Sequence, residues 1–181
     1  MQILIQTRYR CSFDSAVGPI TLLSDGDALT GLYLPQQLAL LKLCDGWIER
    51  HDCFDVAKRY LQQYFARLND CERPQLKLAG TPFQDRVWNE LLSIPFGEVR
   101  TYGQIARAIG RPSASRAVGK AIGDNPVSII VPCHRVIGGS GKLTGYAGGL
   151  AIKRWLLDHE ACLSPTTHSP SALASSTVDR C

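Results

Sequence analysis

The sequence of 181 residues has no run of about 18 or more apolar residues, so it offers no segment suited to crossing a membrane as a helix. Its opening residues, MQILIQTRYRCSF, also lack the apolar core of a secretory signal. We therefore expect no membrane partner. We expect the protein in the cytoplasm, or in the nucleus if its source is eukaryotic.

Regularly spaced cysteines are missing as well. The seven cysteines include no CxxC pair, which argues against a disulfide scaffold and against a zinc knuckle. We expect most of them to be reduced thiols, and we expect neither a metal nor another cofactor. The seven are Cys11, Cys44, Cys53, Cys71, Cys133, Cys162 and Cys181.

Acidic residues are scarce in the middle of the chain. Residues 1–80 have nine basic and nine acidic side chains, whereas residues 100–154 have nine basic side chains against Asp124 alone, a net charge of +8. Such a cluster is typical either of a solvated face or of a surface that binds nucleic acid. The nine are Arg100, Arg107, Arg111, Arg116, Lys120, Arg135, Lys142, Lys153 and Arg154.

The first part of the chain predicts a small α+β domain. Turn residues separate three short apolar segments, which indicates an antiparallel meander of three strands. Helical apolar spacing follows in two segments, and a polar linker comes after them. The expected strands are 3–7, 20–23 and 29–34, the helices 38–49 and 56–68, and the linker 69–80.

Two capping patterns begin the helices of the second part. Thr81 precedes a proline and is followed three residues later by Gln84, and Thr101 is followed in the same way by Gln104. A threonine with glutamine three residues later can form a capping box, in which each side chain bonds to the other residue's backbone. We expect helices from 82 to about 93 and from 102 to Gly110.

A third helix, expected from Ser113 as its cap to about residue 123, completes a helix-turn-helix pattern. Arg116 and Lys120 lie four residues apart and so on one face of it. An ordinary packed helical hairpin is the alternative.

We therefore predict an α+β protein whose second part is mainly helical and winged-helix-like. The expected divisions are an N-terminal α/β domain at 1–79, a second domain with the helix-turn-helix pattern at 80–163, and a disordered tail at 164–181. A last helix is expected over 151–160.

Cys133 has the most suggestive chemical surroundings among the cysteines, because His134 and Arg135 follow it directly. A thiol with a pKa near ~8.5 is mostly protonated at neutral pH and needs a base or a positive field to react. If the segment is extended, neighbouring side chains face opposite ways, so His134 needs a bridging water or a bend at Cys133 to act on the sulfur. Asp158 and Glu160 are the candidate carboxylates to orient the imidazole.

Three other interpretations of Cys133 stay open from these residues alone. It could be an inert buried thiol, a ligand of a zinc ion, or the nucleophile of a cysteine hydrolase. Zinc is disfavoured because adjacent Cys and His seldom bind one ion.

The segment IVPCHRV at 130–136 resembles the signature of the O6-alkylguanine-DNA alkyltransferase family. TPFQDRVWNELLSIPFGEVRTYGQIA and SRAVGKAIGDNP upstream, and GKLTGYAGGLAIKRWLLDHE downstream, resemble the same family in the same order. The resemblance covers about residues 81–161, and more weakly DSAVGPITLL at 14–23.

The resemblance implies roles for individual residues. Cys133 matches the alkyl acceptor, His134 the base that works through a water, and Glu160 the carboxylate that orients this histidine. Asn125 matches the amide that bonds within the active-site turn. Tyr102 matches the tyrosine that contacts the flipped base and a phosphate, and it is our candidate proton donor to the leaving guanine.

Further positions match the DNA contact and the base pocket. Arg116 matches the arginine that enters the base stack, and small neighbours would let its helix approach the minor groove. A small residue is commoner in the family at the position of Lys120, so this sequence departs from the family there. We expect Lys120 to reach a phosphate. The DNA-contacting set is Tyr102, Ser115, Arg116, Ala117, Gly119 and Lys120, and the pocket set is Val136, Tyr146, Ala147 and Gly148, with Gly149 in the same loop.

These matches imply repair by direct reversal, in which the alkyl group of O6-alkylguanine in duplex DNA moves irreversibly to Cys133, once per molecule. A non-catalytic lesion-binding protein of the same fold is the alternative. We expect a monomer in solution. Some family members hold structural zinc in the N-terminal part, but Cys11, Cys44, Cys53 and His51 do not match that set.

Overall fold

The structure is a computed structural model that describes residues 8–40, 46–68 and 72–161. The strand expected at 3–7 and the tail expected at 164–181 lie outside the described residues, as do parts of the expected helix at 38–49 and of the expected linker at 69–80.

The N-terminal part is built on a four-stranded sheet in the order β3-β2-β1-β4. β1 (Arg8–Phe13), β2 (Ile20–Ser24) and β3 (Leu29–Tyr33) form an antiparallel meander, in which β2 and β3 match the strands expected at 20–23 and 29–34 and β1 begins after the strand expected at 3–7. β4 (Trp47–Glu49) adds a fourth strand, parallel to β1. The prediction of helix through residue 49 is therefore wrong, because Gly46 takes a φ of 102° that a helix does not permit.

Two helices accompany this sheet. α1 (Pro35–Leu40) follows β3 directly, and α2 (Asp55–Phe65) follows the 3-10 turn η1 (Asp52–Phe54). The helix expected at 56–68 ends earlier, since Arg67 has a φ of 60°.

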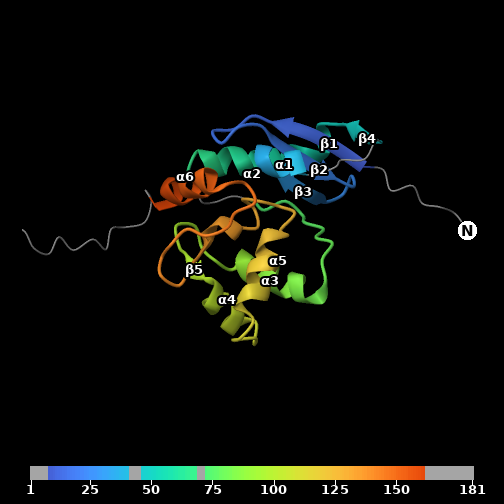
Figure 1. The fold of residues 1–181 in the computed structure, drawn as a ribbon. Helices are drawn as coiled ribbons and strands as arrows, with labels where there is room; N and C mark the ends of the chain where they lie inside the picture. The colour runs from blue at the N-terminus through green and yellow to red at the C-terminus, as the bar shows by residue number, and fades with distance from the viewer. Residues whose placement is uncertain (1–7, 41–45, 69–71, 162–181) are drawn as a thin grey trace, which may run out of the picture.

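Three helices form the lower half of the molecule in Figure 1. α3 (Pro82–Leu92) and α4 (Tyr102–Ala108) begin with complete capping boxes, which confirms the roles expected for Thr81 and Thr101. α5 (Ser115–Gly123) packs against both.

The turn between α4 and α5 differs in detail from the prediction. Ser113 does not cap α5; Ala114 is the N-cap residue and makes no side-chain capping bond. The reason is that the Ala114 amide donates to the Arg111 carbonyl at 2.9 Å, so residues 111–114 form a turn and the cap lies one residue later than expected. Gly110, with a φ of 72°, ends α4 as expected.

The remaining elements surround Cys133. The 3-10 turn η2 (Cys133–Arg135) leads into β6 (Val136–Ile137), which pairs in parallel with β5 (Arg100–Thr101). α6 (Leu150–Ala161) packs against η2 and lies beside α2 in Figure 1.

One buried apolar cluster runs through both parts of the chain, from Leu22 and Phe54 to Trp88 and Val131. Backbone bonds cross the same boundary, because Leu32 of β3 donates to the Pro126 carbonyl at 2.8 Å. The N-terminal sheet thus supports the turn that leads to Cys133. Among the described helices, none has the length and apolarity that crossing a membrane requires.

Candidate active site

A tight turn at residues 125–131 places Cys133. The Asn125 side chain holds this turn, since its Nδ2 donates to the Val131 carbonyl at 2.9 Å and its Oδ1 accepts from the Val127 amide at 3.0 Å. Ile129 within the turn has a φ of 68°, which is strained for a β-branched residue. A strained backbone held by a buried amide is typical of a functional site.

Cys133 follows as the first residue of η2, so the chain bends there instead of continuing as an extended strand. The sulfur lies on the wall of a cavity of about 420 Å³, while the residue itself is only 3% exposed. The cavity is lined by Gln37, Tyr102, Gly119, Ile122, Gly123, Cys133, Thr144, Gly145, Tyr146 and Ala147. A buried nucleophile beside a cavity suits a reaction with a ligand that enters it.

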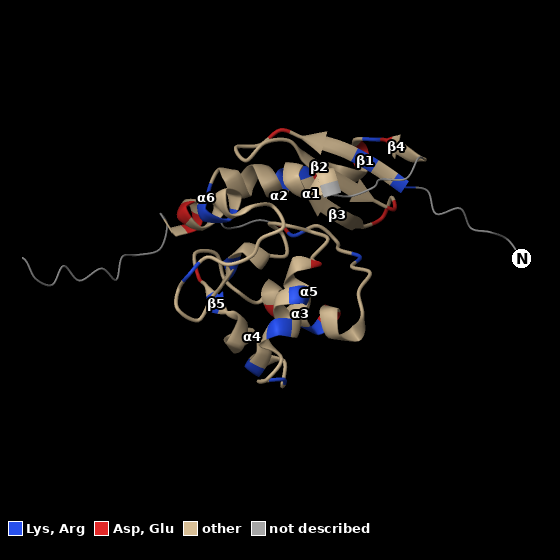
Figure 2. Cartoon of the chain, viewed as in Figure 1, with Lys and Arg blue, Asp and Glu red and all other residues tan. Residues whose placement is uncertain are grey.

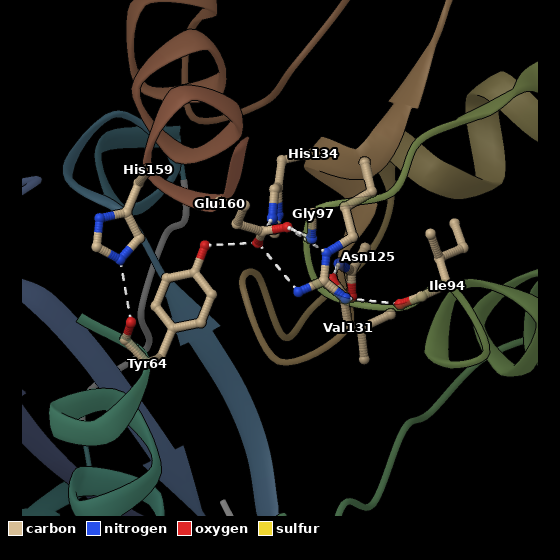
Figure 3. A network of polar contacts seen from close by, with 9 residues as sticks. Tyr64, Ile94, Gly97, Asn125, Val131, His134, His159 and Glu160 are labelled. Carbon is tan, nitrogen blue, oxygen red and sulfur yellow. Dashed lines mark hydrogen bonds and ion pairs between the residues drawn. The ribbon is translucent and has the colours of Figure 1, made fainter. Parts of the chain in front are cut away.

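His134, the residue after Cys133, belongs to a buried polar network that is centred on Glu160 (Figure 3). His134 Nε2 lies 2.7 Å from Glu160 Oε1, and the Tyr64 hydroxyl donates to the same oxygen at 2.8 Å. Arg135 donates through Nε to Glu160 Oε2 at 2.7 Å and through Nη2 to Oε1 at 3.0 Å. Of the two carboxylates considered for orienting His134, the fold selects Glu160; Asp158 is exposed.

The charges of this network are set by burial and by its hydrogen bonds. Burial alone would raise the pKa of Glu160, but the bonds and charges of His134 and Arg135 outweigh it and hold the pKa well below its usual range. Burial lowers the pKa of His134, and Glu160 opposes only part of that shift. A neutral His134 that donates Nε2–H to Glu160 has a free lone pair on Nδ1, which has no hydrogen-bond partner among the described residues. His134 is therefore arranged as a base.

The Cys133 thiol is not poised as a thiolate in the free protein. Burial raises its pKa, while Asn125 and the positive charge of Lys153 lower it in part. The proton of this sulfur therefore has to leave during the reaction.

Lys153 is a fully buried cation of the site. Its Nζ donates to the Val136 carbonyl at 2.6 Å and to the Thr144 carbonyl at 3.0 Å. Burial lowers the pKa of Lys153, and negative charge at Cys133 opposes that shift. The ammonium thus both supports the cavity wall and favours ionisation of the sulfur.

Replacing Lys153 by methionine is expected to raise the Cys133 pKa and to slow alkylation about ten-fold at neutral pH, since one pKa unit changes the thiolate fraction ten-fold. The measurement is the rate of reaction with free O6-benzylguanine across pH, and the profile should move to higher pH. Lys142→Met, at an exposed position in the neighbouring loop, is the control. An equal loss at every pH would show that Lys153 acts only on structure.

Tyr102 lies where α4 and α5 meet the cavity. Its hydroxyl donates to the Thr144 carbonyl at 3.3 Å, and its ring faces Gly119, where an added Cβ would lie 3.7 Å away. Of the other residues predicted for DNA contact, Arg116 and Ala117 are exposed and Ser115 is half-buried. Lys120 is exposed and pairs with Asp124 at 3.0 Å.

The residues predicted for the base pocket divide into two groups. Tyr146 and Ala147 line the cavity. Gly148 is buried against the N-terminal part, since a Cβ there would lie 2.5 Å from Leu34 Cδ1. Val136 is fully buried in β6, and its carbonyl receives the Lys153 bond described above.

Comparison with known proteins gives the family. Residues 82–162 match the model of the DNA-binding domain of 6-O-methylguanine DNA methyltransferase. A methylated-DNA–protein-cysteine methyltransferase of Methanosarcina acetivorans is 49% identical over 154 residues, which are 84% of this chain and 97% of the relative. This chain belongs to the methylated-DNA–protein-cysteine methyltransferase family.

Two further methyltransferase comparisons agree. The methylated-DNA–protein-cysteine methyltransferase of Mycobacterium tuberculosis is 49% identical over 155 residues, which are 85% of this chain and 93% of the relative. The crystal structure of Mycobacterium tuberculosis OGT in complex with DNA matches with a TM-score of 0.79 at 48% identity, covering 85% of this chain and 93% of that chain.

The basic surface of this methyltransferase is smaller than the sequence suggested. Arg135 and Lys153 were counted in the basic cluster, but both are buried, so they do not face a phosphate. The other seven basic residues between 100 and 154 are exposed. Figure 2 shows basic positions along α4 and α5. Residues of both helices also line the cavity that holds Cys133.

A second group of possible ligands lies in the sheet, away from the methyltransferase site. Cys11 Sγ lies 3.2 Å from His51 Nδ1, and Glu49 completes a group whose ligand atoms lie within 4.8 Å of one another. The sequence analysis rejected Cys11 and His51 as zinc ligands because they do not match the zinc set of the family, yet the fold brings them together. Arg10 pairs with Glu49 at 3.1 Å and Lys58 Nζ approaches His51 Nδ1 at 3.4 Å, so cations already use these acceptors and we assign no metal.

Sequence reasoning missed several side chains of the methyltransferase site. Lys153 and Arg135 were interpreted as surface charge, and Tyr64 as one member of an apolar helix face. Gln37 carried no signal, because it lies about a hundred residues before Cys133 in the sequence. The one available indication was the helical position of Lys153, which shares an inward face with Leu156, three residues later, and His159, six residues later.

Proposed function

We propose that this protein repairs DNA by direct reversal, transferring the alkyl group of O6-alkylguanine to Cys133 once per molecule. The single observation that carries the proposal is the position of Cys133, which lines a cavity together with residues of α4 and α5 and directly precedes His134, the partner of Glu160. The membership of the chain in the methyltransferase family supports the same reaction.

The chemical step needs no cofactor. His134 Nδ1 takes the Cys133 proton through a water, and the sulfur attacks the alkyl carbon in line with the O6–carbon bond. The new bond is a thioether; the electrons of the broken bond go to O6, and Tyr102 donates a proton toward the departing guanine. Because a thioether carbon is not readily displaced, the protein acts once.

DNA binding precedes this step. The O6-alkyl group faces into the duplex, so the nucleotide has to leave the base stack before it can enter the cavity. Exposed Arg116 on α5 fills the vacated stack, while the other exposed cations meet phosphates.

We propose that the protein works as a monomer in the compartment that holds the DNA: the cytoplasm, or the nucleus of a eukaryotic cell. We propose that residues 80–163 form the domain that binds DNA and accepts the alkyl group, and that residues 1–79 form a domain that packs against it.

Replacing Arg116 by alanine is expected to slow repair in duplex DNA about 30-fold, equivalent to about 2 kcal/mol of lost support for the extruded nucleotide. Reaction with free O6-benzylguanine should change little, because a free base needs no extrusion. Single-turnover rates on both substrates measure the difference, with Arg59→Ala, at an exposed position of α2 outside the basic cluster, as the control. Equal losses on both substrates would rule out the stack-filling role.

The proposal is tested by incubating the protein with duplex DNA that carries O6-methylguanine and locating added mass by peptide mass spectrometry. We expect one methyl group on Cys133 and one repaired base per protein molecule. Multiple turnovers would indicate a hydrolase, and tight binding without added mass would indicate a lesion-binding protein. Either result contradicts the proposal.

A further inference from the structure

One wall of the reaction cavity comes from the N-terminal part of the chain. Gln37 of α1 is the cavity-lining residue from that part, and it is only 7% exposed. A polar side chain is seldom buried unless its hydrogen-bonding groups are used.

The bonds of Gln37 fix the orientation of its amide. Oε1 accepts from the Leu34 amide at 3.1 Å and from the Ser128 hydroxyl at 2.9 Å. A backbone amide can only donate, so the oxygen and not the nitrogen faces Leu34. Because Oε1 accepts both of these bonds, Nε2 is the end of the Gln37 side chain that can donate a hydrogen bond to a ligand in the cavity.

Tyr146 supplies a second polar group to the same cavity. Its hydroxyl is buried and has no hydrogen-bond partner among the described residues. Ser128, which is fully buried, connects the two groups to the nucleophile, since it bonds Gln37 and lies close enough to Cys133 and Tyr146 to alter their pKa values. The sulfur therefore has polar side chains beside it.

In an in-line displacement the reacting carbon lies between Sγ and O6, so whatever the alkyl group carries on that carbon extends beside the sulfur. We propose that Gln37 and Tyr146 form a polar end of the cavity that binds an oxygen on the alkyl group, so that the protein favours adducts such as O6-(2-hydroxyethyl)guanine over alkyl adducts of equal size. This inference rests on the proposed function and names the class of adduct that the same site prefers.

The test compares two adducts of almost equal size, 2-hydroxyethyl and n-propyl, with methyl as the reference, each in the same duplex. In the native protein we expect the hydroxyethyl group to be transferred about ten times faster than the n-propyl group, after this ratio of rates is divided by the same ratio measured for a small-molecule thiolate. A ten-fold preference is the effect of one good hydrogen bond. Gln37→Met should lower this ratio about ten-fold and Tyr146→Phe several-fold, with methyl transfer reduced about three-fold or less. Gln36→Met, at the exposed neighbouring position, should leave the ratio unchanged.

A purely structural role for Gln37 would slow all three adducts equally and leave the ratio unchanged. An unchanged ratio in both variants, or a native ratio near one, overturns the proposal. If Gln37→Met does not fold, Tyr146→Phe decides the matter, because it removes one oxygen that holds no other residue. Absence of methyl transfer in the native protein would instead contradict the proposed function itself.

Discussion

Cys133→Ala is expected to abolish alkyl transfer and to leave the affinity for alkylated DNA within about two-fold of the native value. The sulfur is the atom that accepts the alkyl group, so no other side chain can replace it. Affinity depends on the exposed cations between 100 and 154, which the change does not touch. Labelled methyl transfer and a salt-controlled binding titration measure the two quantities.

Other thiols supply the control for this experiment. Cys11 is buried, and Cys53 is half-buried with a pKa that burial raises. Cys53→Ala should therefore repair DNA at the native rate. Methyl transfer to any cysteine in the Cys133→Ala protein, or loss of DNA binding together with repair, would contradict the assignment of the acceptor.

Local patterns predicted the helical part of the fold because the determining residues lie close together in the sequence. The capping boxes at Thr81 and Thr101 need partners only three residues away, and both helices begin where those pairs place them. β4 was not predicted, because its pairing with β1 joins residues about forty positions apart. Its apolar residues fitted a helix equally well, and the conformation of Gly46 decided the outcome.

The chemistry of the site was predictable only as far as the motif extends. Asn125, Cys133 and His134 lie within ten residues, and the resemblance adds Glu160. The burial of Arg135 against Glu160 and of Lys153 against two carbonyls depends on where α6 packs. A count of charges along the chain treats both as surface cations, so only the fold separates the buried cations from the exposed ones.

Glu160→Gln is expected to lower the stability of the protein by about 3–5 kcal/mol and the rate of alkyl transfer by about 100-fold or more. Arg135 would keep its buried charge without a carboxylate, and His134 would lose the acceptor that fixes its Nε2–H. Because the folded pKa of Glu160 lies below its unfolded value, its contribution to stability is fully present above the unfolded pKa, about 4.3. It is lost as the pH falls through the folded value. Chemical denaturation of both proteins across pH measures this: the difference in stability should be constant from pH 5 to pH 8 and should shrink at lower pH.

Asp158→Asn is the matched control for the Glu160 change. Both carboxylates lie on α6, two residues apart, but Asp158 is exposed, and an exposed carboxylate contributes little to stability. This variant should keep native stability and native repair. The double variant Glu160→Gln with Arg135→Met should regain part of the lost stability, since it removes the unpaired buried charge, while repair stays slow because His134 still lacks its carboxylate. Recovery of repair together with stability would show that Glu160 acts through folding alone and not by orienting the base.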